Sequence, residues 1–186
     1  MSVLRDSSKV LTGLAVQRIV SFIMIPVIAR LLGPKNYGIF CVAASICAFL
    51  SVFGTLALES SIAVAATERQ AAERTIGVNI IGLLIGFLFF IASYLMHPFL
   101  RDYYSDDITD ALLIMIPIFV PLGIFNASLQ NYVGYLKKFT FFSMAEIISP
   151  LTGYTGLILV YFLFWRDYRC LIASGIISFF SKVKPV

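Results

Sequence analysis

Arg18 is the residue of this chain whose chemistry fits its apolar surroundings least well. It follows Gln17 inside a run that is otherwise rich in aliphatic side chains. A guanidinium in the body of a membrane helix costs about 2.5–3.5 kcal/mol on insertion scales, so it needs an acidic partner or a water-filled cavity. Arg18 is therefore a candidate ligand for an anionic group.

Other polar side chains also interrupt the apolar runs, and two interpretations of them compete. In the structural interpretation, carboxylates neutralise Arg18 and amides hydrogen-bond between helices. In the functional interpretation, they line a cavity open to the cytoplasm that receives a polar or anionic substrate. We favour the second, because intramembrane ionisable groups mark substrate or ion pathways, although Asn126 and Gln130 taken singly are more typical of contacts at helix ends. The candidate substrate-binding residues are Arg18, Gln17, Asn79, Asn126 and Gln130, and the candidate charge partners or ion-coupling residues are Glu59 and Glu146.

The sequence predicts neither a catalytic site nor a metal site, and no cofactor. It contains no Walker loop and no HExxH motif, and its three cysteines lack CxxC spacing. Asp102, Asp106 and Asp107 could form a metal cluster of the kind found in membrane glycosyltransferases. They fall on the predicted outer side of the membrane, however, where a nucleotide donor is absent. The charged stretch 68–74 is predicted to be a solvated helix face.

Membrane helices must position these side chains. The chain has 186 residues, of which 60% are hydrophobic and 13% charged, whereas soluble domains carry about 25% charged residues. A spanning helix needs about 20 mostly apolar residues. We therefore predict an all-α fold, a polytopic membrane helix bundle of about five to six transmembrane helices. The predicted helices cover residues 8–32, 37–65, 76–96, 111–132, 139–164 and 170–181, of which the last is short for a span.

The distribution of Lys and Arg predicts the orientation. Cytoplasmic segments of membrane proteins carry an excess of these residues. If the N-terminus is cytoplasmic, the inner set is the larger one, comprising Arg5, Lys9, Arg69, Arg74, Lys137, Lys138, Lys182 and Lys184. The net charge of +4 is modest and the basic residues are scattered, so we expect membrane lipids as partners and no nucleic acid.

Three stretches resemble a known family. The first is ARLLGPKNYGIF at Ala29–Phe40, the second is GTLALESSIAVA beginning at Gly54, and the third is YLKKFTFFSMAEIISPLTG at Tyr135–Gly153. They are similar to the opening of polysaccharide and O-antigen flippases of the multidrug/oligosaccharidyl-lipid/polysaccharide exporter superfamily. The LGPxxYG turn is the most specific match. In the second stretch, Ser61 stands where the family pattern has alanine.

This resemblance implies a function and a site. The expected function is translocation of undecaprenyl-diphosphate-linked oligosaccharide across the bacterial inner (plasma) membrane, by two helical lobes with alternating access. Arg18 matches a position at which related flippases carry an arginine facing the central cavity. The expected partners are the lipid-linked oligosaccharide and other polysaccharide-assembly membrane proteins. Residues 1–186 would form the N-terminal membrane lobe, without the second lobe.

Three alternatives stay open at this point. One is a multidrug exporter of the same superfamily, and another is a truncated, non-functional remnant of a flippase. A membrane glycosyltransferase or polymerase is less favoured, because the longest predicted outer loop, of about 14 residues, is short for a catalytic loop.

Overall fold

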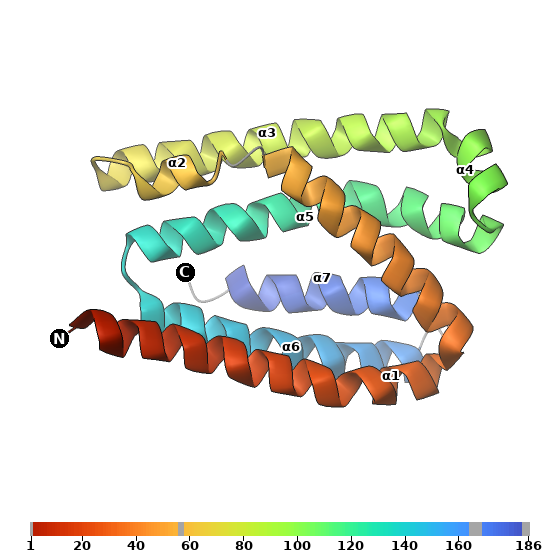
Figure 1. The fold of residues 1–186 in the computed structure, drawn as a ribbon, viewed down its shortest axis with the longest axis horizontal. Helices are drawn as coiled ribbons and strands as arrows, with labels where there is room; N and C mark the ends of the chain where they lie inside the picture. Colours follow the sequence, from red (N-terminus) through yellow and green to blue (C-terminus); the bar gives the residue numbers. More distant parts are fainter. Residues whose placement is uncertain (1, 56–57, 164–168, 184–186) are drawn as a thin grey trace. The chain divides into compact units, whose positions relative to one another are not determined.

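The computed structural model describes residues 2–55, 58–163 and 169–183, and every regular element within them is a helix (Figure 1). The protein is an all-α, polytopic membrane protein, as the sequence predicted. Its elements are α1 (Ser2–Thr55), α2 (Ser60–Ala63), α3 (Glu68–Leu95), α4 (His97–Tyr103), α5 (Asp106–Tyr135), α6 (Phe139–Leu163) and α7 (Arg169–Val183).

Four of the described helices are long and apolar enough to cross a membrane. They cover Val10–Thr55, Glu68–Leu95, Asp106–Tyr135 and Phe139–Leu163, and α7 adds a shorter apolar helix. At 1.5 Å per residue, the 46-residue stretch of α1 is about 69 Å long, roughly twice the thickness of a bilayer core. It is therefore long enough for two crossings.

Gly33 divides α1 into two arms. Its backbone has φ 80° and ψ 156° inside an otherwise helical segment, a region that is essentially open only to glycine. Pro34 follows directly and lacks the amide hydrogen that a continuing helix would use. The last carbonyls of a helical arm need donors from outside its own ladder, and the Tyr161 hydroxyl donates to the carbonyl of Leu31 at 2.9 Å. The LGPxxYG stretch thus forms the break between the arms.

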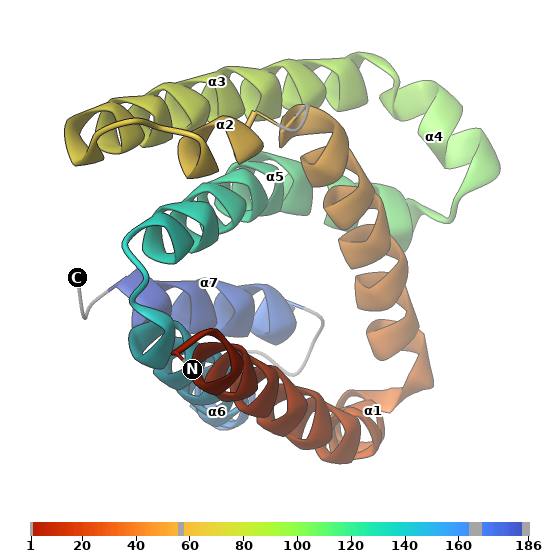
Figure 2. The same cartoon turned by 60° about the vertical axis from the view of Figure 1, so that its left-hand side comes forward.

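The chain forms two compact units. Unit 1 comprises Met1–Gly38 and Lys137–Val186, and unit 2 comprises Ile39–Leu136. Unit 1 therefore contains the first arm of α1 together with α6 and α7, and unit 2 contains the second arm together with α2 to α5. In unit 2, α3 and α5 lie side by side in both views (Figures 1 and 2). The sequence prediction treated residues 1–186 as one lobe and did not anticipate this division.

The predicted helix over 37–65 needs correction. The second arm of α1 ends at Thr55, and α2 is a separate helix of four residues. A turn with Leu58 N–H donating to the Thr55 carbonyl at 2.7 Å follows the end of α1. Downstream, a side chain of α3 takes up the carbonyl of Ser61. A local turn and one tertiary hydrogen bond are found here instead of a continuous helix, and hydropathy alone does not reveal them.

The polar stretches on either side of the 76–96 prediction are helical, as predicted for 68–74 but not for 97–110, which was predicted to be a loop. Thr67 caps α3 by accepting from the Gln70 N–H, so the helix begins at Glu68 and the charged stretch forms its first two turns. The predicted loop over 97–110 contains α4 and the first turn of α5. Pro98 lies in the first turn of α4, where its missing amide hydrogen is tolerated.

Candidate functional site

Gly13 and Leu31 fix how the first arm of α1 packs on α6. A Cβ added at Gly13 would lie 2.6 Å from Ser143 Oγ, so the two backbones approach closely there. The Leu31–Tyr161 hydrogen bond marks a second contact. The two contact positions are separated by the same number of residues on each helix, about five full turns. The arm and α6 therefore run parallel in one register within unit 1.

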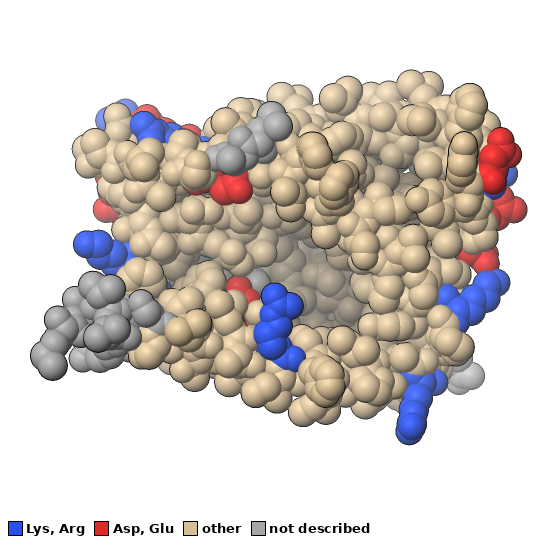
Figure 3. Space-filling model, in the orientation of Figure 1, with Lys and Arg blue, Asp and Glu red and all other residues tan. Residues whose placement is uncertain are grey.

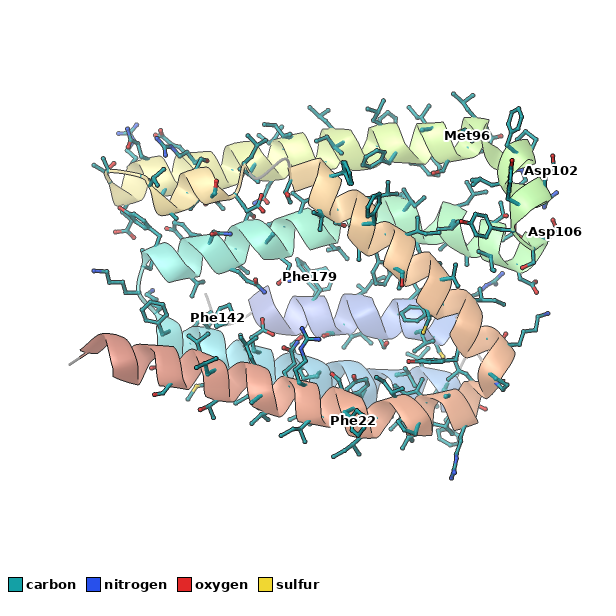
Figure 4. The ribbon with its side chains drawn as sticks, in the orientation of Figure 1. Phe22, Met96, Asp102, Asp106, Phe142 and Phe179 are labelled. Atoms are coloured by element: carbon teal, nitrogen blue, oxygen red, sulfur yellow. The ribbon has the colours of Figure 1, made fainter. Side chains whose placement is uncertain are left out.

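Gln17 and Arg18 occupy different faces of the arm. Gln17 lies one turn after Gly13, next to the stripe that meets α6, and is half-buried. Arg18 lies about 40° around the helix from the buried Leu32, and its side chain is exposed within unit 1. Phe22, on the face opposite Gly13, points away from α6 (Figure 4). Arg18 is thus on the flank of the arm, between the side that packs on α6 and the outward-facing side.

Glu146 is buried in α6 close to the height of Arg18. It is only 3% exposed. It follows Ser143 by three residues while Arg18 follows Gly13 by five, so their Cα atoms differ in height by about 3 Å along the parallel helices. Helical geometry, at 100° per residue from the Gly13–Ser143 contact, places the side chains of Arg18 and Glu146 on the same side of the α1–α6 pair. Gln17, Arg18 and Glu146 therefore share one level of unit 1.

Asn79 is the predicted site residue of unit 2 with a defined partner between helices. The hydroxyl of Ser128 in α5 donates to Asn79 Oδ1 in α3 at 2.6 Å, and Ser128 is fully buried. Glycines of α3 bring the helices together on this face, since a Cβ at Gly82 would lie 2.6 Å from Ile124 Cγ2. The sequence analysis missed Ser128. The available signal was its position: Ser128 is a small polar residue in an apolar run, one helical turn after Ile124.

Asn126 and Gln130 lie on another face of α5. They are one turn apart and half-buried, and helical geometry places them in line with Gly123. A Cβ at Gly123 would lie 2.6 Å from Ser51 Oγ, so this face of α5 meets the second arm of α1. Gln130 already has an interaction partner. Neither residue shares the Asn79–Ser128 contact.

Glu59 is the least satisfied polar side chain in the described chain. It directly precedes α2 and is half-buried. Its Oε2 is buried, and among the described residues it is the one such side-chain atom without a hydrogen-bond partner. The seven predicted residues thus divide between the units. Gln17, Arg18 and Glu146 lie in unit 1, and Glu59, Asn79, Asn126 and Gln130 lie in unit 2.

The acidic residues near α4 form ion pairs at the surface. Arg101 Nε lies 3.1 Å from Asp106 Oδ1, and Arg101 Nη2 lies 3.8 Å from Asp110 Oδ1, with all three side chains largely exposed. Figure 4 shows Asp102 and Asp106 at this end of unit 2. Charged side chains gather there and at the start of α3, and residues other than Lys, Arg, Asp and Glu cover most of the surface between in this view (Figure 3). Within the described ranges, no three His, Cys, Asp or Glu residues are grouped to hold a metal ion.

Comparison with known proteins identifies the family. A family model described as "Polysaccharide biosynthesis protein" matches residues 3–183, nearly the whole chain. The chain belongs to this family. Neither a curated protein nor a solved structure gives a significant match. The resemblance inferred from the three sequence stretches is thereby confirmed at the level of the superfamily.

Proposed function

We propose that this chain moves a lipid-linked oligosaccharide across the bacterial plasma membrane as the first lobe of a two-lobe, non-enzymatic transporter. Its family membership and its four candidate membrane spans support this role. The proposed substrate is a polyprenyl diphosphate that carries the sugar repeat of a surface polysaccharide such as O-antigen. The N-terminus is proposed to face the cytoplasm, because this orientation places the larger set of Lys and Arg inside.

The observation that supports the proposal is that Arg18 is on a helix long and apolar enough to span a membrane, at nearly the height of the buried Glu146 on the adjacent helix. A guanidinium exposed on the flank of its unit can receive both oxygens of a diphosphate, and Gln17 adds an amide one position away. Glu146 would balance the arginine while no substrate is bound, which lowers the cost of keeping the charge in the membrane. When the substrate binds, its diphosphate would take over this role.

The amides of unit 2 are proposed as weaker contacts to sugar hydroxyls. Asn126 and Gln130 share one face of α5 and could serve together. Asn79 accepts a hydrogen bond from Ser128, so its amide nitrogen is the group left for a ligand. Glu59 is proposed to act in charge balance or ion coupling. The carbohydrate specificity of the transporter would depend on these neutral groups more than on Arg18.

Complementation tests this function. In cells whose surface polysaccharide depends on this chain, we expect Arg18→Ala to abolish the polymer and Arg18→Lys to retain part of it, because lysine keeps the charge without the bidentate fork. Arg30→Ala is the matched control, since Arg30 is an exposed arginine on the same arm. Polymer is measured on the cell surface, and membrane insertion is checked by immunoblot. Normal polymer with Arg18→Ala would refute the diphosphate role.

A further inference from the structure

The chain passes between the two units at two points. The first passage follows Gly38 and the second follows Leu136. Near each passage lies a residue with an unusual backbone. Among the described residues, two have a positive φ, Gly33 at 80° and Lys137 at 55°, and a positive φ is uncommon in folded chains outside glycine. The breaks in the helical path therefore coincide with the places at which the chain changes unit.

Gly33 is the break near the first passage. The helix that follows it continues through Gly38 to Thr55 with helical dihedrals, so a change of direction between the two arms of α1 arises at Gly33. A Cβ added at Gly33 would meet no atom within 4 Å. Neighbouring side chains thus do not hold this residue in place, and its backbone dihedrals alone require glycine.

Side chains satisfy the carbonyls at the end of the first arm. The Tyr161 hydroxyl donates to the Leu31 carbonyl at 2.9 Å, and Asn36 Nδ2 donates to the Leu32 carbonyl at 3.2 Å, across the break. A carbonyl without a donor is costly inside a membrane. Because the donors here are side chains rather than amides of a continuing helix, rotation at Gly33 does not require the loss of helical hydrogen bonds.

Lys137 is the break at the second passage. The Leu136 N–H donates to the Tyr132 carbonyl at 3.0 Å, and the Phe142 N–H donates to the Lys138 carbonyl at 3.1 Å. The hydrogen bonds of α5 therefore reach Leu136 and those of α6 begin at Lys138. Lys137 lies between the two ladders with an exposed side chain, in a conformation that glycine usually adopts after a helix.

We propose that Gly33 and Lys137 are the two joints of a hinge about which units 1 and 2 move as separate rigid bodies. Hinge motions are absorbed by a few residues at the ends of elements, while closely packed elements move together. Close packing is present inside each unit, at Gly13 in unit 1 and at Gly82 in unit 2. The inference goes beyond the proposed function, because it makes the first lobe itself a jointed body.

Distances between spin labels test the hinge. The three cysteines of the full chain are replaced by alanine, and nitroxides are attached at exposed positions. Phe22→Cys with Phe87→Cys reports the distance between the units, and Phe22→Cys with Leu159→Cys is the reference within unit 1. Pulsed electron paramagnetic resonance in lipid nanodiscs measures both distributions. We expect the between-unit distribution to be the wider. Equal widths would overturn the hinge.

Alanine variants of two glycines test the first joint. Neither Gly33 nor Gly38 has an atom within 4 Å of an added Cβ, but Gly33 alone of the two has a positive φ. A rotation of about 10° at one end of a helix of about 20 residues moves its other end by about 5 Å. We expect Gly33→Ala to shift the mean between-unit distance by about this amount, and Gly38→Ala to leave it unchanged. Equal distances in the two variants would refute Gly33 as a joint.

Two variants at one position test the second joint. Lys137→Val and Lys137→Gly both remove the charge, but a β-branched residue disfavours a positive φ whereas glycine adopts it readily. We expect Lys137→Val to shift the between-unit distance and Lys137→Gly to keep its mean, with Lys138→Val as the unshifted control. Equal distances in Lys137→Val and Lys137→Gly would refute this joint. Circular dichroism checks that each variant keeps its helices.

The hinge and the proposed function can fail separately. The distance measurements contain no substrate, so their outcome does not depend on what Arg18 binds. If the between-unit distribution is narrow while Arg18→Ala abolishes surface polymer, the hinge fails and the proposed function stands. If the joint variants shift the distance while Arg18→Ala leaves the polymer normal, the hinge stands and the diphosphate role fails.

Discussion

Units 1 and 2 each contain a closely packed pair of helices, but the two pairs are held together differently. In unit 2, a Cβ at Gly86 would lie 2.5 Å from Pro121 Cγ. The helices α3 and α5 therefore approach closely where glycine has no side chain. In unit 1, Ser149 and Ser178 join α6 to α7: their hydroxyl oxygens are 2.6 Å apart, and each lies within hydrogen-bond distance of the other residue's carbonyl.

The two units also differ in the polar groups within their membrane-spanning helices. Unit 1 places Arg18 and the buried Glu146 on adjacent helices at nearly one height. The α3–α5 pair instead places a neutral hydroxyl–amide bond, Ser128 to Asn79, between its helices. Its charged residues lie near the helix ends. Unit 2 therefore pairs its helices through glycines and neutral groups, whereas unit 1 holds Arg18, the proposed anion ligand.

Disruption of the glycine contact should give the largest effect on stability. A Cβ at Gly82 would lie 2.6 Å from Ile124 Cγ2, whereas nothing lies within 4 Å of one at Gly77 on the same helix. Overpacking of this kind costs about 1–3 kcal/mol, so Gly82→Val should lower the free energy of unfolding by that amount relative to Gly77→Val. Unfolding by SDS in mixed micelles, followed by circular dichroism, measures it. Equal stability of the two variants would contradict the close approach of α3 and α5.

Removal of single hydroxyls should give a smaller effect that differs between the units. Hydrogen bonds between membrane helices contribute about 0.6 kcal/mol on average and up to about 1.7 kcal/mol. Ser149→Ala removes the hydroxyl that lies 2.6 Å from Ser178 Oγ and within reach of the Ser178 carbonyl, and should cost near the upper value, although Ser178 Oγ keeps the Ser149 carbonyl as its acceptor. Ser128→Ala loses one bond between helices and should cost near the average. Ser45→Ala is the control, because Ser45 donates only within its own helix. A larger loss for Ser128→Ala would reverse the comparison of the units.

Much of the fold followed from local sequence signals. Helix α6 begins at Phe139, directly after a Lys-Lys pair, and this start was predicted from the sequence. Charge and proline mark such ends without reference to the rest of the fold. The end of α1 at Thr55 was missed, because the apolar pattern continues past it. Beyond the end of α1, the carbonyl of Ser61 accepts a hydrogen bond from Arg74, which is 13 positions further along the chain. A contact between residues so far apart cannot be found from local hydropathy.

The candidate site was predictable as a set of residues but not as an arrangement. A charge inside a membrane helix is costly, so Arg18, Glu59 and Glu146 stood out from their positions in apolar runs of the sequence. Which face Gln17 or Arg18 occupies depends on the close approach of Gly13 to Ser143. That register is set by packing over five turns, and helical periodicity in one sequence leaves it open.

Direct binding of a polyprenyl diphosphate to the purified chain tests the central claim, that Arg18 is the anion ligand. Binding is measured by native mass spectrometry, with the matching monophosphate as the competing ligand. We expect a preference for the diphosphate that Arg18→Ala abolishes, with a loss of about tenfold or more for a bidentate charged contact, and that Arg30→Ala leaves intact. Equal diphosphate affinity in wild type and Arg18→Ala would contradict the account.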